Sequence, residues 1–266
     1  MQIGIVPRFD SQEALDLTEK IVNQFPAEEF VLDSTSGEKL GENGFPIENM
    51  DVDSLITIGG DGTVLYTLQK SEGTPILGIN MGGRGFLADV KPSEATQAVK
   101  KLSKNELKLI ERKRLNVKIS GEHLADALNE GVVRSEEPSR VLSFRILIDG
   151  EEIERTKGDG LIVATPTGST AYAMAAGGPI VDPAVEAFVA VPLSTHRPKT
   201  MPLVYPMSST FEVELLESDR KADVTVDGQV TGKADQGKII QFKKSKNSAK
   251  FFEWKGKFYK KIREKL

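Results

Sequence analysis

The 266-residue sequence contains no cysteine and only two histidines, His123 and His196. It therefore has no disulfides, no thiolate metal ligands and no thiol nucleophile, and a zinc site would need carboxylates to complete it. Apolar residues make up 39% of the chain and charged residues 28%. These fractions are ordinary for a soluble globular protein and exclude intrinsic disorder and a collagen-like fibre. A reducing cytoplasm is the expected compartment.

Long hydrophobic stretches are also missing. The chain does not begin with a basic stretch followed by an apolar one, so no secretory signal is expected. The longest uncharged run, residues 160–181, has the length of a membrane span but is interrupted by Pro166, Gly168 and Pro179. We interpret this run as a buried strand that leads into a ligand-binding loop, and we expect no membrane association.

The net charge of −4 is unevenly distributed. Residues 233–266 contain twelve Lys or Arg and three acidic residues. Such a basic tail can bind nucleic acid or an anionic membrane. Phe242, Phe251 and Trp254 lie among these charges, which favours the rim of a folded core, so nucleic acid is not an expected partner.

The first hundred residues alternate short apolar strands with segments of helical periodicity. This order indicates a Rossmann-like α/β domain with a parallel sheet over residues 1–104. Residues 33–49, rich in Gly, Ser, Glu and Asn, are predicted to form a loop or mobile flap. The expected elements are strands at 3–6, 30–32, 54–58 and 75–79, and helices at 11–25, 63–70 and 93–102, of which the first and last begin at Ser11 and Ser93.

The pattern then changes to many strands and few helices, which predicts a β-rich domain, a β-sandwich, over residues 105–245. The C-terminal segment 246–266 is expected to pack back on the N-terminal domain and to end in a short helix. The expected strands lie at 115–119, 125–133, 141–148, 152–156, 161–164, 211–215, 223–226, 238–242 and 250–254.

The first candidate site is Gly59-Gly60-Asp61-Gly62-Thr63, at the junction of a strand and a helix. Its three glycines allow a tight turn and leave backbone N–H groups open to an anion. A carboxylate in such a loop would be repelled by phosphate unless it held a metal ion or accepted a proton, so Asp61 is a candidate for either role. The alternative is an ordinary turn, since the motif is neither a P-loop nor a dinucleotide fingerprint.

The second candidate is an apolar strand, residues 160–164, followed by a loop rich in hydroxyl groups. These hydroxyls suit a nucleoside or a phosphate, and an Asp159-Gly160 pair before the strand, expected to be buried, favours ligand binding over a purely structural turn. The hydroxyls belong to Thr165, Thr167, Ser169, Thr170 and Tyr172.

Two weaker motifs are Asn129-Glu130 and Asp227-Gly228-Gln229. Adjacent strand residues face opposite sides, so Asn129 and Glu130 can act together only at a strand end or a bulge, which Gly131 favours. An amide beside a carboxylate can bind ribose hydroxyls or a base edge, but a cross-strand polar pair is the alternative. Asp-Gly is foremost a hairpin signal.

Together, in this order and spacing, these motifs resemble the NAD kinase family over roughly residues 55–254. The resemblance implies an enzyme that transfers a phosphoryl group from ATP or polyphosphate to the 2′-hydroxyl of the adenosine ribose of NAD, giving NADP. It also implies a divalent metal, expected to be Mg²⁺, and a homodimer or homotetramer in which a neighbouring subunit helps to complete a site between the two domains.

The resemblance also implies roles for single residues. Asp61 matches the aspartate that accepts the proton. Gly59, Gly60, Gly62 and Thr63 match the phosphate loop, and Gly62 also contacts the dinucleotide. The other implied NAD-binding positions are Asn129, Glu130, Arg140, Lys157, Asp159, Thr167, Thr170, Ala171, Tyr172, Ala175 and Gln229.

Two alternatives remain open from the sequence. A lipid kinase of the diacylglycerol type shares the glycine loop, but it predicts an apolar acyl-chain surface and gives no reason for the hydroxyl-rich turn. A non-catalytic dinucleotide-binding module would bind NAD without turnover.

Overall fold

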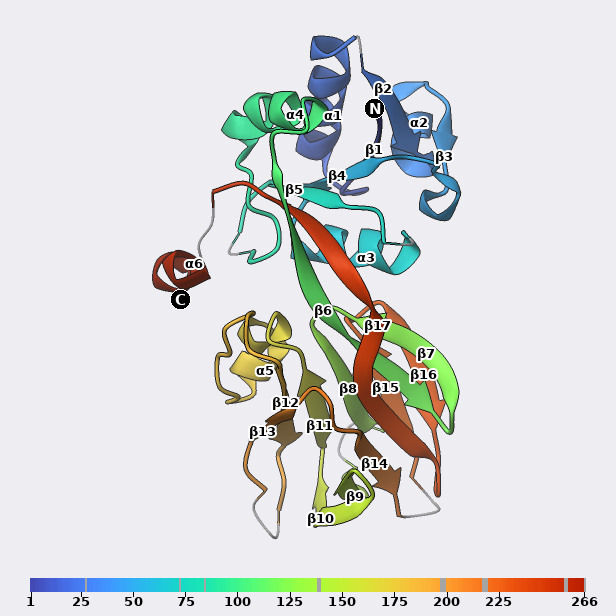
Figure 1. Cartoon of the computed structure of the whole chain (residues 1–266). Helices are drawn as coiled ribbons and strands as arrows, with labels where there is room; N and C mark the ends of the chain where they lie inside the picture. The colour runs from blue at the N-terminus through green and yellow to red at the C-terminus, as the bar shows by residue number, and fades with distance from the viewer. Residues whose placement is uncertain are drawn as a thin grey trace. The chain divides into compact units, whose positions relative to one another are not determined.

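The computed structural model describes residues 1–26, 28–71, 73–83, 85–137, 140–196, 200–216, 220–255 and 258–265. The chain forms two compact units, Met1–Glu111 with Ala249–Leu266 as the first and Arg112–Ser248 as the second (Figure 1). Two long strands, β6 (Lys108–Ile119) and β17 (Ile239–Glu253), contribute residues to both units. The domain borders expected after residues 104 and 245 lie slightly before the observed ones, after Glu111 and Ser248. Each observed border falls inside a continuous strand, where the composition of the sequence does not change.

The first unit is built on a parallel sheet, as its alternation of strands and helices predicts. The strands lie in the order β5-β4-β1-β2-β3, and neighbours pair in parallel. Strand β4 is buried along its whole length, which is typical of a strand covered on both faces. The bounds are Gln2–Pro7 (β1), Glu29–Asp33 (β2), Gly44–Phe45 (β3), Ser54–Gly59 (β4) and Ile76–Asn80 (β5).

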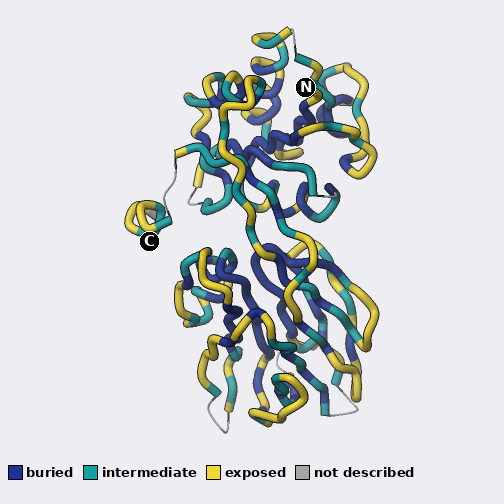
Figure 2. Tube along the Cα trace, in the orientation of Figure 1, coloured by how far each residue is buried: buried dark blue, intermediate teal, exposed yellow. Residues whose placement is uncertain are grey.

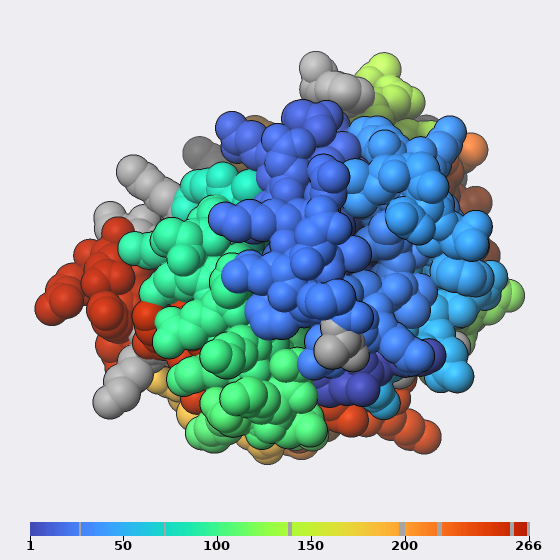
Figure 3. Space-filling view, turned by 90° about the horizontal axis from the view of Figure 1, so that it is seen from above, coloured from blue at the N-terminus to red at the C-terminus, as the bar shows by residue number. Residues whose placement is uncertain are grey.

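Helices α1 (Gln12–Gln24) and α4 (Ala95–Ser103) lie side by side on this unit (Figure 3). The Ser11 hydroxyl accepts a hydrogen bond from the Ala14 N–H and caps α1, as predicted. Apolar side chains of these helices and strands form one core. The buried residues of this unit are dark blue in Figure 2. The other helices of the unit are α2 (Ser34–Leu40), α3 (Asp61–Lys70) and α6 (Phe258–Lys265).

The prediction of a loop over residues 33–49 was wrong. This stretch forms α2, β3 and a 3₁₀ turn at Ile47–Asn49. The Asp33 carboxylate caps α2 by accepting from the N–H groups of Thr35 and Ser36, and Gly41 ends it with φ +72°. Ser93, expected to start a helix, lies instead in a 3₁₀ turn, and α4 begins at Ala95 without a side-chain cap.

The second unit contains two antiparallel sheets whose inner faces share a core, in agreement with the predicted β-sandwich. One sheet has the order β10-β9-β14-β17, with β6 beside β17 and β7 beside β6, and the other has the order β13-β12-β11-β8-β15-β16. The bounds not yet given are Glu122–Ala127 (β7), Glu130–Ser135 (β8), Leu142–Ile148 (β9), Glu151–Gly158 (β10), Gly160–Ala164 (β11), Ala187–Leu193 (β12), Leu203–Pro206 (β13), Phe211–Leu215 (β14), Ala222–Val226 (β15) and Val230–Ala234 (β16).

Several strand predictions in this unit need correction. The strand expected over 125–133 divides into β7 and β8, because the backbone turns at Leu128 and Asn129. The strands expected at 238–242 and 250–254 are parts of the single strand β17. Strands β12, β13 and β16 were not predicted, because proline and glycine in or beside them mask the strand pattern.

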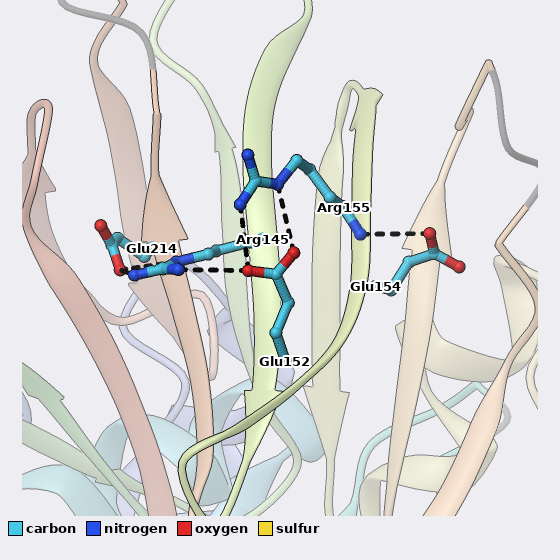
Figure 4. A network of polar contacts seen from close by, with 5 residues as sticks. All are labelled: Arg145, Glu152, Glu154, Arg155 and Glu214. Carbon is cyan, nitrogen blue, oxygen red and sulfur yellow. Dashed lines mark hydrogen bonds and ion pairs between the residues drawn. The ribbon is translucent and has the colours of Figure 1, made fainter.

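The outer surface of the β10-β9-β14 sheet carries a network of charged side chains (Figure 4). The Arg145 guanidinium donates to Glu214 at 2.6 Å and to Glu152 at 3.1 Å, and Glu152 also accepts from Arg155. Cross-strand ion pairs of this kind contribute modestly to sheet pairing.

None of the described helices reaches the length and apolarity that crossing a membrane would require.

Candidate active site

Asp61 is the first residue of α3, directly after β4 and the Gly59-Gly60 pair. Its Oδ1 accepts hydrogen bonds from the N–H groups of Leu87 (3.0 Å) and Ala88 (3.2 Å), and its Oδ2 accepts from Phe86 N–H at 2.6 Å. An ionised carboxylate offers about four acceptor positions. Within the described residues, these bonds fix its orientation and leave one position, on Oδ2, for a donor such as a substrate hydroxyl.

The positions around Asp61 favour glycine for two different physical reasons. A Cβ at Gly59 would lie 2.3 Å from Thr63 Oγ1, and one at Gly85 would lie 2.5 Å from Asp61 Oδ1. At Gly60 and Gly62 a Cβ would meet open space, so these two positions leave the start of α3 unshielded. The first N–H groups of a helix have no partner within it and attract anions. The phosphate-binding role of this loop stays a prediction.

The turn between β7 and β8 carries Asn129 and Glu130, so the two residues lie at a strand end. The Asp227 carboxylate holds this turn by accepting from the N–H groups of Leu128 and Asn129, both at 2.7 Å, and of Glu130 at 3.1 Å. The sequence identified Asp227 only as a hairpin residue, and it does occupy the β15–β16 turn with φ +51°. Its second role was missed because the partners are 97 to 99 residues away.

Glu130 is a buried carboxyl group, 8% exposed, whose Oε2 has no hydrogen-bond partner among the described residues. Burial, and then the charge of Asp227, raise the pKa of Glu130 to about 8, although a hydrogen bond from the Tyr172 backbone lowers it. Burial also raises the pKa of Asp227, against its three backbone donors and the nearby charge of Arg114. The raised pKa favours the protonated form of Glu130, which can donate a hydrogen bond to a ligand.

The hydroxyl-rich loop packs against the same turn. Thr165 N–H donates to Asn129 O at 2.8 Å, and a Cβ at Gly168 would lie 2.1 Å from the same oxygen. Ser169 Oγ is fully buried, donates to Pro166 O and accepts from Val181 N–H. Several of the hydroxyls assigned to a ligand from the sequence therefore hold the loop itself, while Thr167 is half-buried and Tyr172 exposed.

Thr165→Val is expected to lower the free energy of unfolding by about 2–3 kcal/mol, measured by urea denaturation. The Thr165 hydroxyl donates to Leu128 O at 2.5 Å and accepts from Gly168 N–H at 3.0 Å, and both backbone groups are buried. Thr167→Val is the matched control, because the Thr167 hydroxyl makes no hydrogen bond within the described residues, and it should change stability by less than about 0.5 kcal/mol. Equal losses in the two variants would contradict this role of Thr165.

The structure brings only part of the predicted site together. Ala164, at one end of β11, pairs with Glu130, whereas Gly160, at the other end, pairs with Arg134. Asp159 therefore lies four or more strand residues from Glu130, roughly 13 Å or more along β11. Asp159 is exposed, and the expectation that it is buried with Gly160 was wrong, because it precedes the strand.

Lys157 belongs to the Asp159 end of the strand. It lines a hollow of about 510 Å³ together with Val141, Ser143, Arg155, Thr156 and His196. Arg140 is exposed and pairs with Glu137 at 3.4 Å. Of the remaining predicted positions, Thr170 is buried, Ala171 half-buried, and Ala175 and Gln229 exposed.

Comparison with known proteins bears on the whole chain. Residues 42–107 match the model of the ATP-NAD kinase N-terminal domain, and residues 128–254 match that of the ATP-NAD kinase C-terminal domain. The chain is 41% identical over 273 residues to an NAD kinase of Methanothermobacter thermautotrophicus, covering 100% of this chain and 96% of that protein. It is 37% identical over 267 residues to an NAD kinase of Thermoplasma acidophilum, covering 100% and 98%.

Two solved structures are similar. An NAD kinase from Archaeoglobus fulgidus in complex with ATP is 31% identical, with a TM-score of 0.82 and 99% of each chain covered. Yeast NADH kinase complexed with NADH is 23% identical, with a TM-score of 0.91, covering 99% of this chain and 86% of that one. The second likeness concerns the fold alone.

Proposed function

The chain belongs to the NAD kinase family, and we propose that Asp61 accepts the proton of the hydroxyl group of NAD that this enzyme phosphorylates, the 2′-hydroxyl of the adenosine ribose. It is an enzyme that phosphorylates NAD. In the proposed step, the 2′-oxygen of the adenosine ribose attacks the γ-phosphorus of ATP, a P–O ester bond forms, the β–γ anhydride bond breaks, and ADP leaves. The hydroxyl proton passes to Asp61 Oδ2. The observation that carries the proposal is the fixed Asp61 carboxylate, which among the residues that the structure describes keeps one acceptor position, on Oδ2.

The second unit offers the groups that recognise NAD. Asn129 and the protonated Glu130 lie at one strand end beside the Tyr172 backbone, where an amide and a carboxyl group can bond ribose hydroxyls. Tyr172 is exposed beside them and offers an aromatic face to a base. These positions, with Thr167, Thr170, Ala171 and Ala175, are the proposed NAD-binding surface.

ATP is the proposed phosphoryl donor. The Archaeoglobus fulgidus relative forms a complex with ATP, and the N-terminus of α3 offers N–H groups to its phosphates. In the part of the chain that the structure describes, no three Asp, Glu or His side chains cluster to hold a metal ion. These side chains therefore do not fit a resident metal site, and we propose that Mg²⁺ enters with ATP as part of the substrate, as is usual for this ion. Polyphosphate is the alternative donor.

We propose a homo-oligomer, a dimer or tetramer, in which one copy completes the site of another. Lys157 and Asp159 lie at the end of β11 opposite to Glu130. If both groups of residues bind NAD, as the family resemblance implies, a second copy of the chain can supply Lys157 and Asp159. Both nucleotide substrates are expected in the cytoplasm, which is the proposed compartment.

The acceptor can be tested with NAD that lacks the 2′-hydroxyl of its adenosine ribose. With ATP labelled in its γ-phosphoryl group, we expect label transfer to NAD and to the 3′-deoxy control, and none to the 2′-deoxy analogue. The analogue should bind about 10-fold more weakly, because the groups that bonded its hydroxyl are left unpaired. Label transfer to diacylglycerol at a rate comparable to NAD would contradict the proposal in favour of a lipid kinase. NAD binding without product from ATP or polyphosphate would favour a non-catalytic module.

A further inference from the structure

The position of Asp61 depends on a separate loop of the first unit, residues 85–88. Three successive N–H groups of this loop, those of Phe86, Leu87 and Ala88, bond the Asp61 carboxylate. Any displacement of the loop therefore displaces the carboxylate or breaks its hydrogen bonds.

One end of this loop is fixed to the sheet. Val90 N–H donates to Gly78 O at 3.1 Å, and Val90 O accepts from Asn80 N–H at 2.8 Å. The other end follows Gly82 and Gly83, which have φ values of +138° and +99°. Glycine backbones have the widest conformational freedom, so the position of the Phe86 end depends on its attachments to other segments of the chain.

Lys261, on helix α6, provides one of these attachments. Its Nζ donates to Phe86 O at 3.0 Å and pairs with Asp89 Oδ2 at 2.6 Å, and the Lys261 and Asp89 side chains are only 16% and 17% exposed. The bonded Phe86 is the residue whose N–H donates to Asp61 Oδ2. Phe86 thus connects the two side chains: its carbonyl accepts from Lys261, and its N–H donates to Asp61.

The face of α6 that carries Lys261 is its less exposed face. Phe258, Lys261 and Ile262 recur at helical spacing and are all half-buried, whereas Lys260 and Glu264 are exposed. Lys260 pairs with Glu264 at 3.9 Å, and both side chains are more than half exposed, so that pair contributes little.

We propose that Lys261 is a positioning residue for Asp61. By holding the 85–88 loop, Lys261 couples the C-terminal helix to phosphoryl transfer. The inference rests on the proposed role of Asp61 as proton acceptor. Because the lysine would act through the 85–88 loop, its effect is expected on the chemical step and not on NAD affinity.

The test compares Lys261→Met, Lys261→Arg and Lys260→Met by steady-state kinetics and thermal unfolding. Lys261→Met should lower kcat about 10- to 100-fold and leave the KM for NAD within about 2-fold, because misplacement of a reacting group by a fraction of an ångström to one ångström has this effect. Lys261→Arg keeps a charged donor and should recover kcat to within about 3-fold of wild type. Lys260→Met, on the same helix, should match wild type.

A double variant separates positioning from general structural damage. If Lys261 acts through Asp61, adding Lys261→Met to Asp61→Asn should leave the residual kcat unchanged within about 2-fold. If Lys261→Met fails to fold, Lys261→Leu, which likewise has no donor for Phe86 O, takes its place in the same cycle.

A kcat within 2-fold of wild type in Lys261→Met, or equal kcat losses with and without Asp61, would overturn the inference. Either result leaves the role of Asp61 intact if Asp61→Asn alone lowers kcat by about 10²- to 10⁴-fold. Near-normal turnover in Asp61→Asn would instead overturn the proposed function, and the inference with it.

Discussion

Asp61→Asn is expected to lower kcat by about 10²- to 10⁴-fold while NAD binds within a few-fold of wild type. An asparagine keeps the size of the side chain, and its oxygen can still accept from Leu87 and Ala88 N–H. Its NH₂ group replaces Oδ2, so it faces the Phe86 N–H and cannot take a proton from the substrate. NADP formation measured with an NADP-specific dehydrogenase gives kcat, and calorimetric titration gives the NAD dissociation constant.

Asp53→Asn is the matched control for this substitution. The Asp53 carboxylate also accepts a backbone N–H, that of Gln2 at 2.9 Å, but it is exposed and precedes β4 instead of following it. Its kcat should equal that of wild type. Retention of near-normal turnover by Asp61→Asn would mean that another group accepts the proton.

Glu130→Gln is expected to remove a pH-dependent loss of up to about 5 kcal/mol in the free energy of unfolding, which the wild type undergoes between pH 4.5 and pH 8. Glu130 ionises near its ordinary pKa of 4.5 in the unfolded chain and at about 8 in the folded protein. A raised carboxyl pKa contributes stability that is fully present below pH 4.5 and is lost as the pH rises to 8, by about 1.4 kcal/mol per pH unit. Glutamine fills the same space without ionising, so the variant should gain stability relative to wild type across this window.

The measurement is urea denaturation of both proteins at one-unit steps from pH 5 to pH 9. The difference in the free energy of unfolding should grow up to about pH 8 and then level off. Glu122→Gln, an exposed carboxyl on the neighbouring β7, should show no such growth. A constant difference across the window would show that Glu130 ionises normally in the folded protein.

The sequence was sufficient for features that depend on neighbours along the chain. Helical spacing and a capping serine located α1, and apolar runs followed by glycine located β4 and the start of α3 with Asp61. Asp227-Gly228 was correctly predicted to form a hairpin turn. These signals are local because they reflect backbone preferences and the alternation of buried and exposed positions.

Only the tertiary structure decided how the site is held. Asp61 bonds a loop 25 to 27 residues away, Asp227 bonds a turn nearly a hundred residues away, and Lys261 bonds Phe86 from 175 residues away. The burial that raises the pKa of Glu130, and the separation of Asp159 from Glu130 along β11, follow from strand register. Sheet order and register are set by packing between distant segments, so residues close in the sequence, such as Asp159 and Thr165, can end at opposite ends of one strand.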